Sequence, residues 1–119
     1  MYTVSVEGTF SATHRVALPD GSLEPMHGHD WHVRVYLAGE TLNESNMVAD
    51  FEAVLRALQS VLSQWQHRDL NEHADFATMS PTAETVAKVV FEKLRASGLQ
   101  DLVRVRITER PGCIAEYEA

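Results

Sequence analysis

Apolar and polar residues alternate along two stretches near the N-terminus. The first, YTVSVEGTFSATH, is rich in Val, Thr and Phe and predicts a β-strand over Tyr2–His14, with a bulge at Gly8. The second predicts a strand over His29–Ala38, because its apolar residues recur at every other position. The segment between them contains prolines and a glycine, which favour a loop. We therefore expect the two strands to pair in antiparallel fashion.

The hydrophobic period then changes to three and four residues. From Met47 to Trp65 this spacing predicts an amphipathic helix, with Asp50 or Asn46 as its N-cap. A polar segment, QHRDLNEHADF, separates this helix from the next apolar stretch.

The C-terminal half predicts one more helix and two more strands. We expect Ser80 to cap the helix with Pro81 at its first position, and we expect Gly98 to end it. The alternating run 103–107 predicts a third strand, and Cys113–Tyr117 predicts a short fourth strand after a Pro-Gly turn.

These elements give the order ββααββ and the class α+β. We expect a single domain over residues 1–119, built as a four-stranded antiparallel sheet with both helices on one face. A small open sheet leaves two edge strands, and edges of this kind are usually covered or paired. Self-association through the edges is therefore expected.

Composition narrows the class of function. The formal net charge of −7 argues against a nucleic-acid surface, which needs clustered Lys and Arg. No apolar run reaches the length of a membrane-spanning helix, and the N-terminus lacks the pattern of a signal peptide, so we expect a cytoplasmic protein. Cys113 is the only cysteine, which excludes an intrachain disulfide and a cysteine-rich zinc module. Any metal must be held by histidines and carboxylates.

The histidines are the strongest chemical signal. His27 and His29 flank a glycine at the start of the second strand, and residues i and i+2 of a strand point to the same face. An antiparallel partner strand can bring His14 opposite this pair. Three histidines around one point form a zinc site with a fourth position open, the arrangement of catalytic zinc. His32 lies on the opposite face and His73 in a polar loop, so we expect both to be ordinary polar residues.

Six segments, in this order and spacing, resemble the 6-pyruvoyltetrahydropterin synthase and 6-carboxytetrahydropterin synthase family: FSATH, HGHD with the following HVRV, VADFEAVLRAL, HRDLN, SPTAETVA and ITERPGC. The resemblance covers nearly the whole chain. It implies the tunnelling fold, in which trimers close a twelve-stranded barrel and two trimers stack into a hexamer.

The resemblance also implies roles for individual residues. His14, His27 and His29 match the family's zinc ligands, so the implied cofactor is Zn2+. Glu109 matches the glutamate that anchors the pterin. A carboxylate suits this role because it can accept two parallel hydrogen bonds from the guanidine-like edge of the ring. Without the resemblance, Glu109 would be interpreted as a solvated charge at a strand end.

The sequence departs from the family pattern at two places. Members that form the pyruvoyl or carboxy product carry a catalytic cysteine four residues before the first histidine of HGH, where this chain has Leu23. Cys113 belongs to the last strand, and we expect it to be buried and inert. The family's Asp-His pair appears here as Gln66-His67, so His67 lacks its acidic partner.

Glu24 stands three residues before His27, and this ExxHGH spacing is similar to the subgroup in which glutamate takes over from cysteine. That subgroup cleaves the side chain of 7,8-dihydroneopterin triphosphate to 6-hydroxymethyl-7,8-dihydropterin, a folate precursor. A carboxylate is a weak base for the removal of a carbon-bound proton. A hydroxyl coordinated to zinc is far more acidic than a free hydroxyl, so a carboxylate can deprotonate it. The hypothesis is that Glu24, assisted by His67, takes a hydroxyl proton so that a carbon–carbon bond breaks.

Three alternative functions are also compatible with the sequence. The protein can be a family member acting in queuosine (7-deazaguanine) or tetrahydrobiopterin synthesis, if another group replaces the missing cysteine. It can be a pterin-binding or metal-binding homologue without catalysis, in which Glu24 is a solvated loop charge. It can also be an unrelated zinc hydrolase with a three-histidine site, which would act on esters and ignore pterins.

Overall fold

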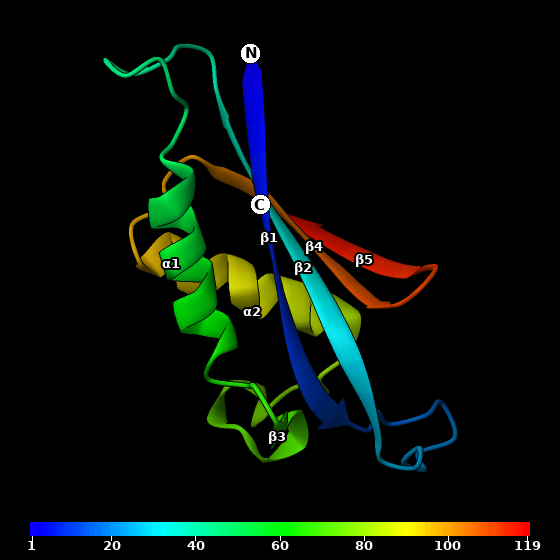
Figure 1. Cartoon of the computed structure of the whole chain (residues 1–119). Coiled ribbons are helices and arrows are strands. Elements are labelled where there is room, and N and C mark those ends of the chain that lie inside the picture. The colour runs from blue at the N-terminus through cyan, green and yellow to red at the C-terminus, as the bar shows by residue number, and fades with distance from the viewer.

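The computed structural model describes all 119 residues, and its elements follow the predicted order with one additional short strand (Figure 1). Two single-turn 3-10 helices, η1 (Leu70–Glu72) and η2 (Ala74–Phe76), lie between the two α-helices. The strands and α-helices are β1 (Tyr2–His14), β2 (His27–Gly39), α1 (Phe51–Leu62), β3 (Arg68–Asp69), α2 (Ala83–Ala96), β4 (Leu102–Arg110) and β5 (Cys113–Glu118).

The strands form one sheet in the order β3-β1-β2-β4-β5. The β1–β2 ladder is antiparallel and runs from the Tyr2–Gly39 pair to the His14–His27 pair. The prediction of four antiparallel strands is wrong in one respect, because β3 pairs with β1 in parallel and makes the sheet five-stranded and mixed. A two-residue strand is too short to leave an alternating pattern in the sequence.

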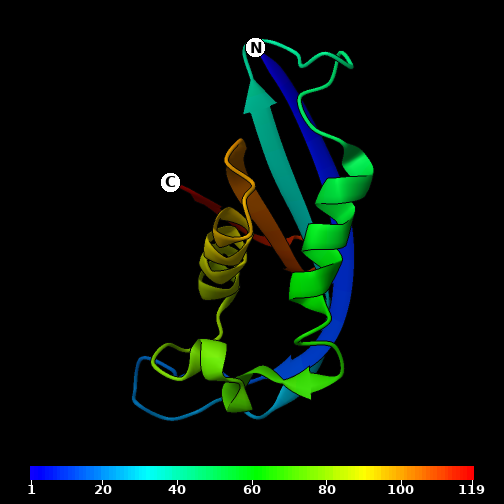
Figure 2. The same ribbon diagram turned by 90° about the vertical axis from the view of Figure 1, so that its left-hand side faces the viewer.

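One face of the sheet is buried beneath both helices (Figure 2). The alternating apolar residues of β1, β2 and β4 point into this core, where they meet the apolar stripes of α1 and α2. The expected bulge at Gly8 does not occur, since β1 and β2 pair in unbroken register. The glycine is needed for a different reason: a Cβ there would lie 3.0 Å from Cδ1 of Leu62, so its absence lets α1 approach the strand.

Two helix ends agree with the prediction, namely the Asp50 cap of α1 and the end of α2 before Gly98, whereas the end of α1 and the cap of α2 differ by a few residues. Helix α1 begins after Asp50, whose side chain accepts a hydrogen bond from the Glu52 N–H, and it ends before Trp65. Helix α2 is capped by Thr82 and not by Ser80, because the Thr82 hydroxyl accepts the N–H of Thr85. No helix is long and apolar enough to cross a membrane.

Candidate metal centre and its neighbouring carboxylates

Three histidine side chains gather at one end of the β1–β2 ladder. His14 pairs with His27, and His29 pairs with Ala12, so all three imidazoles project from the inner face of the sheet. Their ligand atoms lie within 4.8 Å of one another, and Nε2 of His14 is 3.1 Å from Nε2 of His27. Two nitrogens on one tetrahedral zinc ion lie about 3.3 Å apart. The spacing is therefore close to that of a shared metal ligand pair.

The hydrogen bonds of the imidazoles leave nitrogen lone pairs for a metal. Nδ1 of His14 donates to the carbonyl of Pro81 at 2.8 Å, and Nδ1 of His27 donates to the carbonyl of Pro25 at 2.9 Å. In a neutral imidazole this arrangement directs the free lone pair to Nε2, as in the tautomer that binds metals. Nε2 of His29 is buried and has no hydrogen-bond partner. An unpartnered buried nitrogen beside two others fits a bound zinc ion.

Burial also affects the pKa of one of these histidines. It lowers the pKa of His29 below its usual value, and the neighbouring carboxylate of Glu109 only partly opposes this shift. The two other histidines act in the same direction as burial. The imidazole of His29 is therefore neutral at neutral pH, as a metal ligand must be.

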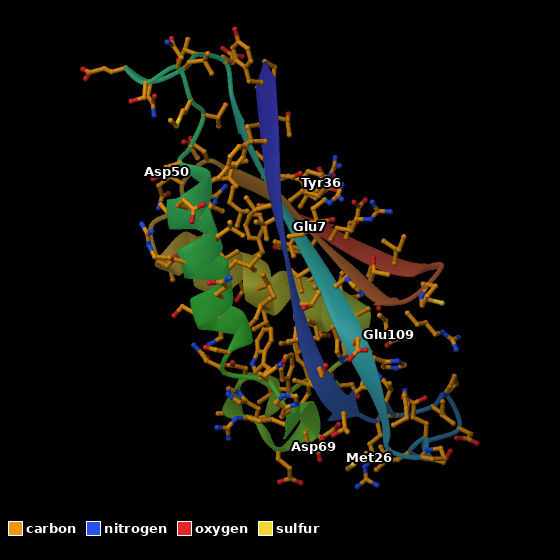
Figure 3. The ribbon with its side chains drawn as sticks, in the orientation of Figure 1. Glu7, Met26, Tyr36, Asp50, Asp69 and Glu109 are labelled. Atoms are coloured by element: carbon orange, nitrogen blue, oxygen red, sulfur yellow. The ribbon has the colours of Figure 1, made fainter.

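Two carboxylates flank the histidines. Oε1 of Glu109 lies 3.4 Å from Nε2 of His14, and Oε1 of Glu24 lies 3.7 Å from Nε2 of His27. Glu109 comes from the end of β4, and its side chain lies toward the same end of the sheet as Met26, the residue before β2 (Figure 3). Both glutamates are about three-quarters buried. The family resemblance implied a base at Glu24 and a pterin anchor at Glu109, and the fold brings both carboxylates close to the histidines.

Glu24 owes its position to backbone pairing within the 15–26 loop. Its N–H donates to the carbonyl of Val16 at 3.0 Å, and its Oε1 accepts the N–H of Val16 at 3.1 Å. An antiparallel bridge between Ala17 and Leu23 holds the next residues of the same short ladder. A carboxylate held in this way is not a freely solvated loop charge.

A hollow of about 600 Å³ opens beside Glu109. The N-terminus of α2, with Thr82 and Glu84, forms one wall, and the β4–β5 hairpin with Cys113 forms another. The expectation of a buried thiol is wrong, since Cys113 is only partly buried and its sulfur accepts a hydrogen bond from Nε of Arg110 at 3.3 Å. Residues on the last strand of a small sheet keep one side open to solvent.

His67 lies in the turn between α1 and β3. Its N–H donates to the carbonyl of Ser11, and its Nε2 is 3.3 Å from Nε2 of Gln66. It lines a second hollow, of about 500 Å³, together with Ser11, Asp30 and also His29 of the histidine cluster. No hydrogen bond or ion pair joins His67 to the three histidines. Within one chain, Glu24 contacts the cluster directly, whereas His67 shares a hollow with His29 without a hydrogen bond or ion pair to it.

The two remaining histidines have ordinary environments. His32 is exposed on the open face of β2. His73 caps η2 by accepting the N–H of Asp75 at Nδ1. Neither residue belongs to the metal cluster.

Sequence reasoning did not find the groups that orient the ligands. The carbonyls of Pro25 and Pro81 fix two imidazole rings, and the peptide of Val16 fixes Glu24. Backbone groups carry no residue-type signature, so only the three-dimensional structure reveals them.

Several known proteins are similar to this chain. The family model described as 6-pyruvoyl tetrahydropterin synthase matches residues 3–119. A 6-carboxy-5,6,7,8-tetrahydropterin synthase from Synechocystis is 30% identical over 98% of this chain and 93% of its own. A dihydroneopterin monophosphate aldolase from Pyrococcus furiosus is 30% identical over 73% of this chain and 69% of its own. The solved structure of Caenorhabditis elegans 6-pyruvoyl tetrahydropterin synthase is 30% identical, with a TM-score of 0.87 over 99% of this chain and 95% of its own.

Proposed function

Because this chain belongs to the 6-pyruvoyl tetrahydropterin synthase family, we propose that it is a zinc-dependent lyase that cleaves the side chain of 7,8-dihydroneopterin triphosphate to 6-hydroxymethyl-7,8-dihydropterin. The observation that carries the proposal is the carboxylate of Glu24, 3.7 Å from Nε2 of His27, in a chain with Leu23 at the family's cysteine position. The aldolase from Pyrococcus furiosus supports it, since an aldolase breaks a carbon–carbon bond.

His14, His27 and His29 would hold the zinc ion through nitrogen atoms that lie within 4.8 Å of one another. When bound, zinc supplies a Lewis acid that lowers the pKa of a coordinated hydroxyl. A hydroxyl acidified in this way is within the reach of a carboxylate base, whereas a carbon-bound proton is not.

Glu24 is the proposed base. Its carboxylate takes the proton of a side-chain hydroxyl, the hydroxyl carbon becomes a carbonyl, and the adjacent carbon–carbon bond breaks. The electron pair of that bond moves into the pterin ring system, and a proton returned to the ring-side carbon completes the hydroxymethyl group. This cleavage needs no oxidant or reductant. The N–H of Val16 keeps the carboxylate oriented during the transfer.

Glu109 is the proposed anchor of the pterin. Its two oxygens can accept hydrogen bonds from the ring N–H and the exocyclic amino group, while the neighbouring hollow of about 600 Å³ receives the ring. Because Glu109 lies against His14, an anchored pterin would present its side chain to the metal cluster.

We infer that His67 acts in the site of a neighbouring copy, within a homo-hexamer of the kind that the family resemblance implies. Two features support this inference. His67 makes no hydrogen bond or ion pair with the histidines of its own chain. The sheet also has open edges, since β5 is unpaired on its outer side and β3 covers only two residues of β1.

A second candidate activity is that of a 6-carboxytetrahydropterin synthase, which the Synechocystis relative favours because it matches almost the whole chain. This activity requires a group that replaces the missing cysteine, and Glu24 would then have to deprotonate carbon. A homologue that binds pterin without turnover is the remaining alternative.

Product analysis tests the proposal. Zinc-loaded protein is incubated with 7,8-dihydroneopterin triphosphate, and the products are identified by mass spectrometry and pterin fluorescence. We expect 6-hydroxymethyl-7,8-dihydropterin, and we expect Glu24→Gln to abolish its formation with zinc content unchanged, since the amide oxygen still accepts the Val16 N–H. A carboxy product would favour the second candidate, and unchanged substrate would favour a binding protein. Undiminished turnover by Glu24→Gln would remove Glu24 from the role of base.

A further inference from the structure

The side chain of Asn71 holds both backbone groups of Arg15. The N–H of Arg15 donates to Oδ1 of Asn71 at 2.9 Å, and Nδ2 of Asn71 donates to the carbonyl of Arg15 at 3.0 Å. A carboxamide has the same donor and acceptor as a peptide group. Asn71 therefore acts toward Arg15 as a neighbouring strand would.

This contact extends the sheet beyond its last backbone pair. Strand β3 pairs with β1 at Thr13 and Asp69, and Arg15 and Asn71 lie two residues further along their segments. Asn71 is itself fixed, because its N–H donates to Oδ1 of Asp69 at 3.0 Å and the intervening Leu70 is fully buried. Asp69 lies at the same end of the molecule as Met26, which closes the 15–26 loop (Figure 3). Asn71 is therefore held firmly in its contact with Arg15.

Arg15 stands between two functional elements. The residue before it is His14, and the residue after it is Val16, whose N–H and carbonyl hold the side chain and backbone of Glu24. Rotation of the Arg15 peptides would move Val16 and therefore Glu24. The histidines do not depend on this contact, since the β1–β2 ladder fixes them.

We propose that Asn71 is a positioning residue that sets the place of the Glu24 carboxylate relative to the histidine cluster. This inference rests on the proposed function of Glu24 as base. Asn71 acts through Arg15 and Val16 and does not touch the substrate. Its removal would leave the metal site intact and displace the base, and a misplacement of about 1 Å can cost roughly a hundredfold in rate.

Asn71→Ala tests the proposal, with Asn43→Ala as the matched control. Asn43 also binds a loop through its side chain, accepting the N–H groups of Ser45 and Met47, but it lies beyond the far end of β2. Three quantities are measured on the zinc-loaded proteins: zinc content, kcat and KM for side-chain cleavage, and the amide proton shift of Val16. Glu24→Ala provides the reference shift for a Val16 amide without its carboxylate partner.

We expect Asn71→Ala to keep zinc, to lose about tenfold to a hundredfold in kcat with little change in KM, and to move the Val16 amide to the Glu24→Ala value. Asn71→Asp retains the acceptor for the Arg15 N–H but not the donor, so its effects should be intermediate. Asn43→Ala should match the wild type in all three quantities.

A Val16 amide that keeps its wild-type shift in Asn71→Ala overturns the proposal, as does an unchanged kcat. A purely structural role would lower the melting temperature and leave the Val16 shift and the kcat of folded, zinc-loaded protein unchanged. If the wild type does not cleave the pterin side chain, the proposed function fails, while the Val16 shift still decides whether Asn71 positions Glu24.

Discussion

Nε2 of His14 lies 3.4 Å from Oε1 of Glu109, although strand β2 separates their two strands in the sheet. The contact is possible because β4 leaves its pairing with β2 at Thr108, near the bulge that leads into β5, so that Glu109 reaches across the inner face. The proposed pterin anchor, Glu109, and a proposed metal ligand, His14, are thus in direct contact. Substitution of a histidine should affect metal binding, and substitution of Glu109 should affect pterin binding.

His29→Ala should abolish stoichiometric zinc binding. The ring of His29 contributes a buried nitrogen that has no other partner, so its loss removes one of three ligands without breaking a hydrogen bond at that nitrogen. Zinc content after dialysis, measured by atomic absorption, checks this expectation. His32→Ala is the control, because His32 is exposed on the other face of the same strand and should keep full zinc content. Full zinc retention in His29→Ala would contradict the assigned metal site.

Glu109→Gln should weaken pterin binding by roughly a hundredfold and leave zinc content unchanged. A glutamine offers one acceptor and one donor, and its amino group opposes one of the two donors on the pterin edge. Titration with a non-reactive pterin, followed by fluorescence, measures the affinity. Glu118→Gln serves as the control, since Glu118 is paired with Arg104 on the exposed end of β5. Equal affinities of Glu109→Gln and the wild type would exclude the anchoring role.

Mixed oligomers of Glu24→Gln and His67→Ala should recover activity that neither variant has alone. If each site takes Glu24 from one copy and His67 from the next, random mixing in equal amounts restores about a quarter of the sites. The variants are co-refolded or co-expressed, and specific activity is compared with that of unmixed samples. Mixtures that stay as inactive as their components would place the two residues in the same chain or remove His67 from catalysis.

Thr82→Ala should lower the free energy of unfolding by about 1 kcal/mol, because the Thr85 N–H loses its capping acceptor. Ser80→Ala is the paired control, and its hydroxyl makes no capping bond to α2. Urea unfolding followed by circular dichroism compares the two variants. A larger effect at Ser80 than at Thr82 would restore the cap position inferred from the sequence pattern.

The sequence predicts the long elements because their periodicity is repeated many times. Thirteen alternating residues in β1 leave little doubt about the faces of the strand, and the HGH triplet follows the same rule. The helix caps are less determined, since a serine and a threonine two residues apart both fit an N-cap. The strand β3 lacks a pattern, because two residues contain no period.

The candidate site is likewise only partly predictable from the sequence. The three histidines follow from strand alternation, but the contact between Glu24 and Val16 depends on the path of a loop with no repeating pattern. The position of His67 depends on a turn after α1, where this residue adopts a positive φ of 59° that its sequence neighbours do not indicate. Tertiary geometry decides both positions.

The unbroken register of β1 and β2 makes the proposed metal site dependent on correct pairing of these two strands. A slip by one residue would turn every side chain of one strand to the other face, and His14 would then lose His27 and His29 together. A mispaired chain would therefore lack the proposed site, whereas a correctly paired chain would gain the free energy of binding an ion there. Retention of zinc by a preparation would thus report the fraction of molecules whose longest strand pair is aligned as in the native ladder.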